Sequence, residues 1–434
     1  MPFGFYMVIA AQFATALADN ALLIVAIAVL DERQMPVWLA PLLRFCFTIA
    51  YVVLAPVAGP LADAWPKAAL MAWMNGIKVL GVLALLVGMH PLLAFAVIGL
   101  GAAGYAPAKY GIVSEMVATR RLVAANGWIE VSAVCAVLLG TVIGGALVGR
   151  GVDGSAAAAW LQRLASAIPS RAPSALAFAL LLLLGVYALA ALLNLGARGT
   201  RLCAGCSAPQ AHGGRHPMAL LRSFRHSNAL LWSDRDGSLS LLVTTLFWGF
   251  GATLQFAVLE WAVEALGLQL SQAAYLQAVV AVGVVAGAAL AGWLVPIDGA
   301  GRVLPAGICL GLLVSCVAGS TDVRLAALLL VGVGLVGGIL LVPMNAMLQH
   351  RGLRVLSAGR SVAVQGFNEN LGVLAMLGVY AAVIACGVPI VPLMIGFGLM
   401  VALVMVWIIR RRRHAPGLPA TDAAAGEWPG AREP

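Results

Sequence analysis

Long apolar runs of about twenty residues dominate the chain from its first residues to about residue 409. As a helix, a run of this length spans the hydrocarbon core of a bilayer, which is roughly 30 Å thick. Lipid cannot pair with backbone N–H and C=O groups, so only helices or a closed barrel cross it. Barrel strands would alternate apolar and polar residues, and these runs do not. The pattern therefore predicts membrane-spanning helices.

Twelve such runs predict an all-α membrane protein with twelve transmembrane helices. Their approximate bounds are 5–30, 37–59, 68–89, 92–113, 127–149, 174–196, 238–265, 272–295, 303–321, 325–349, 361–384 and 388–409. A long polar stretch separates the sixth run from the seventh. We therefore expect an N-terminal six-helix bundle at 1–196, a cytoplasmic central loop at 197–237, a C-terminal six-helix bundle at 238–409 and a basic, disordered cytoplasmic tail at 410–434.

Composition supports a membrane protein and charge gives its orientation. The chain is 62% hydrophobic and 10% charged, whereas soluble domains carry about 25% charged residues. Most loop Lys and Arg residues lie on the side of the two termini, including the run Arg410–Arg413. The positive-inside rule then predicts that both termini are cytoplasmic. The net charge of +9 reflects this topology, and we expect no nucleic-acid partner. The first run is too long for the core of a cleaved signal peptide and should remain as the first helix.

The sequence gives little sign of a cofactor, a metal or an enzyme. Cys203, Cys206, His212 and His216 are metal-ligand residue types, but only five residues separate the two pairs. Zinc sites usually leave twelve or more, so we expect a solvated loop there. The chain lacks phosphate-binding and catalytic motifs of the common enzyme classes. The segment 151–169 is expected to form a short amphipathic helix outside the membrane.

A short internal repeat relates the two predicted halves. Asn-Gly-Trp-Ile-Glu opens the fifth run at 126–130, and Gln-Gly-Phe-Asn-Glu opens the eleventh at 365–369. A basic loop precedes each, and a proline, Pro107 or Pro343, stands near the end of the helix before it. Two similar halves in the same orientation are typical of six-plus-six secondary transporters.

Ionisable residues inside the predicted helices are the strongest functional signal. Each costs roughly 2.5–3.5 kcal/mol near the membrane centre, so it needs a partner or a water-filled cavity. Asp19 lies 14 residues into the first run, about 21 Å deep at 1.5 Å per residue, and Asn20 follows it. The others are Arg44 and Lys78 in the second and third runs, Lys109 with Tyr110 in the fourth, and Glu130 and Glu369 at equivalent places in the fifth and eleventh.

Some of these residues also have a purely structural interpretation. Lys109 could pair with Glu130 or Asp63 and hold an inner gate closed. Lys78 could form a structural ion pair or extend toward the membrane surface. Glu369, which lies between Asn368 and Asn370, could cap and bridge helices.

Asp19 and Asn20 are the hardest to explain by structure alone, because they lie deep in the first helix. We expect them to line a cavity. Its expected further lining is Trp248 and Gln255 from the seventh run, and Asn345 and Gln349 from the tenth. One acid, one base, several amides and much aliphatic surface suit an amphiphile whose zwitterionic end meets Lys109 and Asp19.

The loop between the second and third runs reads Gly-Pro-Leu-Ala-Asp-Ala-Trp-Pro-Lys at 59–67. It resembles the signature loop of the major facilitator superfamily, and the resemblance implies that Gly59, Asp63 and Lys67 belong to an inner gate. Two basic residues of that signature are missing here. The charge network at the gate is therefore expected to be thinner.

Several strings together resemble the bacterial lysophospholipid transporter family over about 400 residues. They are 11–13 with 19–23, 107–111, 125–127 with Glu130, 246–249, Pro343 with 345–346 and 348–349, 351–352, and 364–365 with 369–370. The resemblance implies transport of lysophospholipids, chiefly lysophosphatidylethanolamine, from the outer to the inner leaflet of the bacterial inner membrane. It also implies a functional partner, an acyltransferase/acyl-carrier-protein synthetase, that re-acylates the lipid. The family's helix 1 acid and Asn match Asp19 and Asn20, and its helix 4 Lys matches Lys109.

One departure from the family pattern concerns charge. The family has an Arg in helix 7 where this chain has Gln255, and an uncharged residue where this chain has Arg44. A phosphate needs a cation, so we hypothesise that Arg44 replaces the charge missing at Gln255. We expect a monomer without cofactors. Two other functions remain open: a proton-coupled exporter of drugs or metabolites, with Asp19 as proton carrier, and a membrane scaffold that only recruits an acyltransferase.

Overall fold

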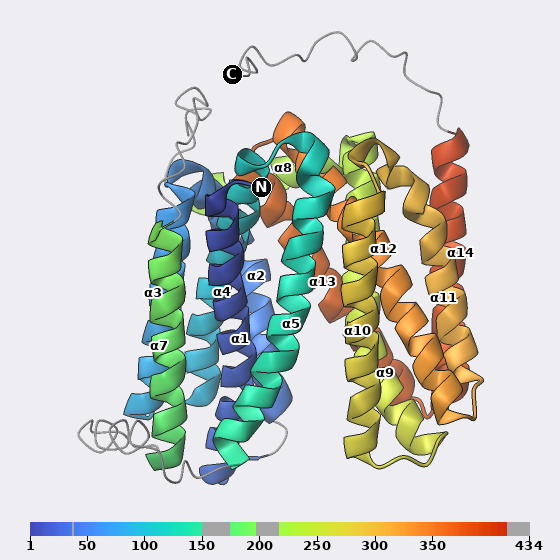
Figure 1. Cartoon of the computed structure of the whole chain (residues 1–434), viewed down its shortest axis with the longest axis horizontal. Helices are drawn as coiled ribbons and strands as arrows, with labels where there is room; N and C mark the ends of the chain where they lie inside the picture. The colour runs from blue at the N-terminus through green and yellow to red at the C-terminus, as the bar shows by residue number, and fades with distance from the viewer. Residues whose placement is uncertain (37–38, 150–173, 197–216, 415–434) are drawn as a thin grey trace.

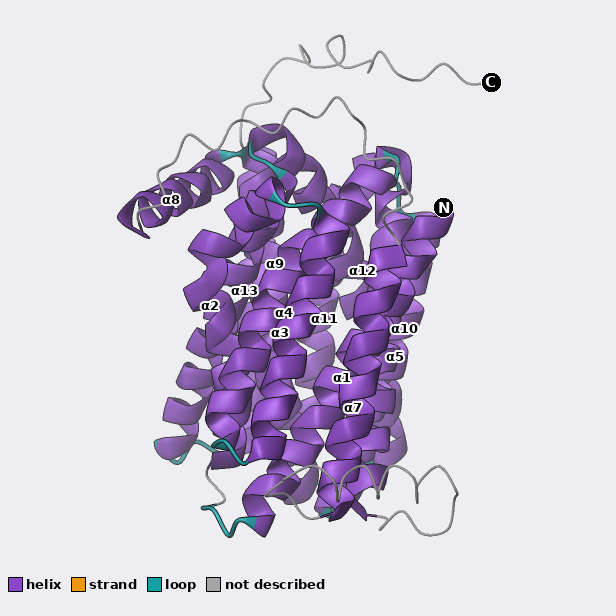
Figure 2. Ribbon diagram, turned by 90° about the vertical axis from the view of Figure 1, so that its left-hand side faces the viewer, coloured by secondary structure: helices purple, strands orange, loops and turns teal. Residues whose placement is uncertain are grey.

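The computed structural model describes residues 1–36, 39–149, 174–196 and 217–414, and every long element within them is an α-helix (Figures 1 and 2). The first six long helices are α1 (Phe3–Glu32), α2 (Leu39–Ala64), α3 (Lys67–Val87), α4 (Pro91–Met116), α5 (Leu122–Gly149) and α7 (Ser174–Gly196). The last six are α9 (Arg235–Glu264), α10 (Leu270–Leu294), α11 (Leu304–Ala318), α12 (Val323–Val355), α13 (Ala358–Ala385) and α14 (Ile390–His414). Helix α8 (Pro217–Ser233) lies between the two sets, and short 3-10 helices at Thr119–Arg121 and Ile297–Val303 precede α5 and α11.

Twelve helices of the described ranges are long and apolar enough to cross a membrane. This number confirms the predicted all-α architecture with twelve spans. Three predicted features lie outside the described residues: the amphipathic helix at 151–169, the loop that holds Cys203 to His216, and residues 415–434 of the tail. Residues 410–414, predicted as the start of the disordered tail, instead continue α14.

Local signals determine where several helices begin and end. The Asp234 side chain accepts a hydrogen bond from the Gly237 N–H at 2.8 Å and caps α9. Ser357 accepts from the Arg360 N–H at 3.4 Å and caps α13. Gly88 ends α3 with a φ of 96°, a left-handed conformation that glycine adopts without steric cost.

Helices α1–α5 and α7 form one half of the molecule, and α9–α14 form the other (Figure 1). Each half has its own apolar core. Residue 1 and the end of α14 lie on the same face of the bundle, which we call the terminal face (Figure 1). We call the opposite face the distal face. The first, third and fifth helices of each half therefore begin at the terminal face, and the second, fourth and sixth end there.

The two halves join tightly near the terminal face. A side chain at Gly127 of α5 would stand 2.9 Å from the Ala288 carbonyl oxygen of α10. A side chain at Gly59 of α2 would stand 2.9 Å from the Arg360 Cα of α13. Glycine at these positions lets the backbones of the two halves approach.

Toward the distal face the halves separate. In Figure 1 α5 and α10 lie side by side near the terminal face and spread apart below. The buried residues of α13 end at Gln365, and the rest of that helix is exposed or half-buried. Within the described ranges, every hydrogen bond between the two halves lies near the terminal face. The space between the halves is therefore closed at the terminal face.

Helix α8 is a feature that sequence analysis missed, because it assigned 197–237 to a loop. The helix lies on the terminal face and projects to one side of the bundle (Figure 2). Phe224 and Leu231 are buried. Phe224 packs edge-to-face against Phe367 of α13, with the two ring centroids 5.1 Å apart. Arg222 and Arg225 are exposed, and these charges lower the mean hydropathy that would otherwise have marked a helix.

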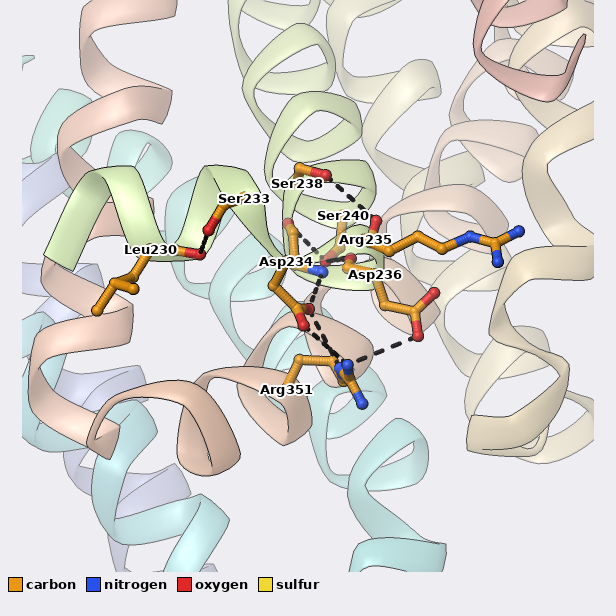
Figure 3. Close-up of polar contacts among 9 residues, drawn as sticks. Leu230, Ser233, Asp234, Arg235, Asp236, Ser238, Ser240 and Arg351 are labelled. Atoms are coloured by element: carbon orange, nitrogen blue, oxygen red, sulfur yellow. Dashed lines mark hydrogen bonds and ion pairs between the residues drawn. The ribbon is translucent and has the colours of Figure 1, made fainter. Parts of the chain in front are cut away.

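An ion pair fixes the junction of α8 and α9 to the end of α12 (Figure 3). The Arg351 guanidinium donates to both Asp234 oxygens, with Nη2–Oδ1 at 2.8 Å and Nε–Oδ2 at 3.2 Å. Burial alone would raise the pKa of the Asp234 carboxyl, but the hydrogen bonds from Arg351 and the Gly237 N–H outweigh it. The pKa of Asp234 is therefore below its ordinary value.

Candidate functional site

Asp19 of α1 forms an ion pair with Lys78 of α3 inside the N-terminal half. The Lys78 ammonium donates to Asp19 Oδ1 at 2.8 Å and to Oδ2 at 2.7 Å, and the Tyr187 hydroxyl of α7 donates to Oδ1 at 2.7 Å. The Lys78 side chain is 0% exposed and that of Asp19 is 16% exposed. A buried cation of this kind needs a tightly bound partner. Of the two structural roles considered for Lys78, the structure places it in an ion pair.

Asp19 therefore meets Lys78 and not Lys109. Sequence analysis had assigned Asp19 and Lys109 together to one head group without identifying the Lys78 pairing. Asn20 next to it donates its side-chain N–H to the Ala16 carbonyl of its own helix at 2.8 Å. Both residues remain partly accessible, so the Asp19 carboxylate keeps one open side.

Lys109 of α4 is a cation without a close anion. Its ammonium lies 4.1 Å from the centre of the Tyr110 ring. Among the described residues no carboxylate lies within 4.0 Å of it, although Glu130, Glu369 and Asp19 are near enough to act on it electrostatically. Neither ion pair considered for Lys109, with Glu130 or with Asp63, is present at that distance. The side chain is half-buried and keeps charge available for another group.

Glu130 of α5 and Glu369 of α13 bring an acid from each half toward Lys109. Glu130 is buried. Glu369 is half-buried and accepts a hydrogen bond from Gln365 at 2.8 Å. The Gln365 side chain also donates to Asn345 Oδ1 of α12 at 2.9 Å. Asn345 therefore supports Gln365 and Glu369 from a buried position and does not itself line an opening.

Gln365 is a site residue that sequence analysis did not single out. Its spacing of four residues from Glu369 on one helix was the available signal, since side chains at i and i+4 share a face. Gln365 orients the Glu369 carboxylate.

Gln349 of α12 has a different place from the one predicted. It exchanges two hydrogen bonds with Asn126 of α5, with Nδ2–Oε1 at 3.0 Å and Nε2–Oδ1 at 2.8 Å. Both side chains are buried. This amide pair joins the halves near the terminal face, so Gln349 belongs to the closure and not to the lining of a cavity.

Arg44, Trp248 and Gln255 have exposed side chains. Arg44 and Gln255 lie in the part of the bundle nearer the distal face, whereas Trp248 lies near the middle of α9. Arg44 lies 20 residues from the end of α2, and Gln255 lies 20 residues from the start of α9. At 1.5 Å per residue each is about 30 Å from the terminal face. No described carboxylate forms an ion pair with the Arg44 guanidinium, and Asp19 and Tyr51 act on it only electrostatically. Arg44 therefore carries an available charge at the depth of Gln255.

Asn368 and Asn370 flank Glu369 on α13 and are held differently. The Asn368 amide donates to Asn228 of α8 at 2.9 Å and accepts from the Trp232 indole of α8 at 3.2 Å. The Asn370 amide donates to the Gly366 carbonyl of its own helix at 2.8 Å. Asn368 thus links α8 to the helix that carries Glu369.

The end of α2 closes the terminal face through Asp63. The Asp63 carboxylate accepts a hydrogen bond from the Ser357 hydroxyl and another from the Gly359 N–H at 2.9 Å, and Arg360 lies 4.0 Å from it. Lys67 pairs with Glu115 of α4 at 2.6 Å within the N-terminal half. The contact of Asp63 with α13 and the close approach at Gly59 place the end of α2 at the junction of the halves, so residues 59–64 of the predicted gate loop belong to a helix.

A family match and two similar proteins agree on the family to which this chain belongs. Residues 8–375 match the Major Facilitator Superfamily. A protein named lysophospholipid transporter LplT from Shigella flexneri is 37% identical over 412 residues, which cover 94% of this chain and 96% of that protein. The protein of the same name from Escherichia coli O7:K1 is 37% identical over 414 residues, with the same coverage of both chains.

Solved structures with the same fold share less sequence. The major facilitator superfamily transporter FucP in the outward conformation has a TM-score of 0.71 at 16% identity, covering 94% of this chain and 98% of that one. A bacterial homologue of ferroportin in an outward-facing state has a TM-score of 0.66 at 15% identity, covering 94% and 100%. These two structures support the fold.

Proposed function

Because this chain belongs to the lysophospholipid transporter family of the major facilitator superfamily, we propose that it moves lysophospholipids, chiefly lysophosphatidylethanolamine, from the outer to the inner leaflet of the bacterial inner membrane. The relatives that support this proposal are named lysophospholipid transporters and match 94% of the chain. The twelve apolar helices make it a multi-pass membrane protein.

The observation that carries the proposal is the presence of two cations without close anions, Lys109 and Arg44, between helices that the closure leaves accessible. A phosphate diester is an anion and needs such a cation in a low-dielectric site. Lys109 binds the phosphate. Arg44 lies about 20 Å closer to the distal face than Lys109, at 1.5 Å per residue, so it attracts the phosphate earlier on its way in, at the depth where Gln255 carries no charge. The ethanolamine ammonium then meets the carboxylates of Glu369 and Glu130.

Transport follows alternating access between the two halves. The terminal face is cytoplasmic in this proposal, because the loops on that side hold most of the basic residues. The structure then represents a state closed to the cytoplasm, with Asp63 and the Asn126–Gln349 amide pair holding the halves together. Opening requires these contacts to break. Asp19 switches partners between Lys78 and the bound head group as the halves rock.

The product reaches the cytoplasmic leaflet, where an acyltransferase/acyl-carrier-protein synthetase consumes it by re-acylation. This partner acts on the lipid and need not bind the transporter. The proposed transporter works as a monomer, since each chain contains both halves that alternating access requires.

Uptake of labelled lysophosphatidylethanolamine into spheroplasts tests the proposal. Wild-type protein should support uptake, and Lys109→Ala and Asp19→Asn should lose most of it. Arg324→Ala is the matched control, because Arg324 is an exposed cation at the distal end of α12. No uptake by wild type, or transport of unrelated compounds that depends only on a pH gradient, would favour a proton-coupled exporter instead.

A second set of variants tests separately whether Arg44 supplies the positive charge that is missing at Gln255. Arg44→Gln should reduce lysolipid uptake, and Arg44→Gln with Gln255→Arg should restore part of it, because the two positions have equal depth. Uptake at the wild-type level in Arg44→Gln would discard the role of Arg44 and leave the role of Lys109 intact.

A further inference from the structure

Four polar side chains form a cluster in the interior of the N-terminal half. They are Thr15 of α1, Asn75 of α3, Tyr105 of α4 and Asn194 of α7, and we call them the buried polar cluster. Asn75 and Asn194 are 0% exposed, and the other two are no more than 5% exposed. Four helices thus direct polar groups into one solvent-inaccessible region of the core.

The buried polar cluster lies directly next to the Asp19–Lys78 ion pair. Three helices contribute to both groups: Thr15 comes four residues before Asp19, Asn75 three before Lys78, and Asn194 seven after Tyr187. All three steps lead toward the terminal face, because α1 and α3 begin there and α7 ends there. The Lys78 ammonium also lies 5.8 Å from the centre of the Tyr105 ring. The cluster therefore lies one to two helical turns closer to the terminal face than the ion pair does.

The hydrogen-bonding capacity of this cluster is largely unused. The Thr15 hydroxyl donates to Asn75 Oδ1 at 3.2 Å. Asn75 Nδ2, the Tyr105 hydroxyl and both amide atoms of Asn194 have no hydrogen-bond partner of normal geometry. The Tyr105 hydroxyl nevertheless lies near Thr15 and Asn194. On α1, Gln12 Oε1, one turn before Thr15, is also unpartnered.

Such a concentration of unpaired atoms has an energetic consequence. Each buried polar atom without a partner costs about 1–3 kcal/mol, and several of them in one place would destabilise this half severely. Buried water normally occupies such sites and makes about three hydrogen bonds to groups that are otherwise unsatisfied. The mixture of donors and acceptors here suits water, which can satisfy both.

A metal cation fits this cluster less well. The amide nitrogens of Asn75 and Asn194 are donors that a cation would repel. The described residues of the cluster include no carboxylate, and the nearby Asp19 is already paired with the Lys78 ammonium. A cation would therefore enter a region that already holds a positive charge.

We propose that the buried polar cluster holds a small group of ordered water molecules behind the Asp19–Lys78 ion pair. These waters hydrate the side of the ion pair that faces the terminal face. They reduce the cost of separating Lys78 from Asp19, because the ammonium is not left in an apolar core when its partner moves. The inference does not depend on which substrate the protein transports.

Radiolytic labelling of the purified protein tests the proposal. Hydroxyl radicals generated from bound water oxidise the side chains beside it, and mass spectrometry locates the products. Tyr105 should be oxidised although it is buried. Trp261 is the matched control, because it is an intrinsically reactive ring that is 0% exposed, and its indole N–H is already satisfied by the Ala318 carbonyl at 3.2 Å.

Variants connect the labelling to the cluster. Asn75→Leu with Asn194→Leu should lower Tyr105 oxidation severalfold and leave the labelling of exposed aromatic residues unchanged. Thr15→Val preserves side-chain shape and should lower it less, and this variant serves if the double variant does not fold. Tyr105 labelling no higher than that of Trp261, or unchanged in a folded variant, would overturn the proposal.

Thermal melting gives a second readout. If the cluster were dry, Asn194→Leu would remove unpaired atoms and raise the melting temperature. If it holds water, the variant loses those hydrogen bonds and the melting temperature falls. A melting temperature that rises with Na⁺ but not with choline, and does so only in the wild type, would also contradict the proposal and indicate a cation site.

Discussion

The two halves of the molecule have different interiors. The N-terminal half buries the charged residues Lys78 and Glu130, and it also holds the buried polar cluster. Among the described residues of the C-terminal half, the fully buried side chains are apolar or neutral polar. There α10 and α12 pack through glycines, and a side chain at Gly287 would stand 2.0 Å from the Leu335 carbonyl oxygen.

This difference gives the two halves different roles: the N-terminal half recognises the substrate, and the C-terminal half supports it rigidly. Buried charge is costly in a membrane and persists where function needs it, whereas close glycine contacts give rigid packing without charge. We infer that the N-terminal half provides most of the head-group chemistry. The C-terminal half supplies Glu369 on α13 and otherwise acts as a rigid body against which the first half moves.

The largest effect is expected from breaking the ion pair of the N-terminal half. Lys78→Ala leaves the Asp19 carboxylate without its cation, and removal of one partner from a buried pair typically costs about 3–5 kcal/mol. The variant should melt well below wild type in detergent and should not transport. Asp19→Leu with Lys78→Met removes both charges, so it should recover thermal stability but not uptake. A wild-type melting temperature for Lys78→Ala would show that the pair is not structural.

The next largest effect is expected in the glycine packing of the C-terminal half. Gly287→Ala forces α10 and α12 apart, and overpacking of this kind usually costs about 1–3 kcal/mol. The melting temperature should fall, while the ratio of uptake for different head groups stays constant. Gly251→Ala on α9 is the control, since among the described residues no atom of another helix lies within 4 Å of a Cβ there. A change in head-group preference for Gly287→Ala would contradict the supporting role of this half.

A smaller effect is expected where the halves meet. Asn126→Leu removes both hydrogen bonds with Gln349 and leaves the buried Gln349 amide unpaired, which costs about 1–3 kcal/mol. The cost falls on the state closed at the terminal face, so a cysteine placed at Ala124 should react faster with a maleimide added from that side. The reporter is used in a background without native cysteines. Asn370→Leu should leave the rate unchanged, because the Asn370 amide donates to the Gly366 carbonyl of its own helix.

The smallest effect is expected from pH at the junction of α8 and α9. The pKa of Asp234 is lower in the folded protein than its ordinary value. Its stabilising contribution is therefore complete above the unfolded pKa of about 3.9 and is lost as pH falls through the lower, folded pKa. Melting curves between neutral pH and pH 3 should show part of the acid-induced loss disappearing in Asp234→Asn. An identical acid slope in both proteins would contradict the role of the Arg351 contact.

The spans and the positions of the intramembrane charges could be predicted from sequence, because both depend on length and local composition. The placement of Asp63 at the junction was also accessible through the signature loop. The partner of Asp19 could not be predicted, because its pairing with Lys78 depends on how α1, α3 and α7 are rotated about their axes. A sequence fixes the depth of a side chain in a helix but not the neighbour it meets.

The amides of α12 illustrate the same limit. Asn345 and Gln349 were predicted to line a cavity, but the structure buries both, one behind Glu369 and one against Asn126. The helix α8 was missed for another reason. Phe224 and Leu231 recur at a helical spacing on one side, and a test of periodicity instead of mean hydropathy would have detected it.

Binding of lipid to the purified protein tests the central claim, that Lys109 recognises a phosphate. The measurement compares lysophosphatidylethanolamine with a monoacylglycerol of the same chain, which lacks the phosphate, in wild type and Lys109→Ala. A lost charged hydrogen bond of about 1.5–3 kcal/mol corresponds to roughly 10- to 150-fold in affinity. We predict a loss of this size for the lysophospholipid in Lys109→Ala and weak binding of the monoacylglycerol to both proteins. Equal affinity of wild type for the two lipids, or unchanged lysophospholipid binding in Lys109→Ala, would contradict the account.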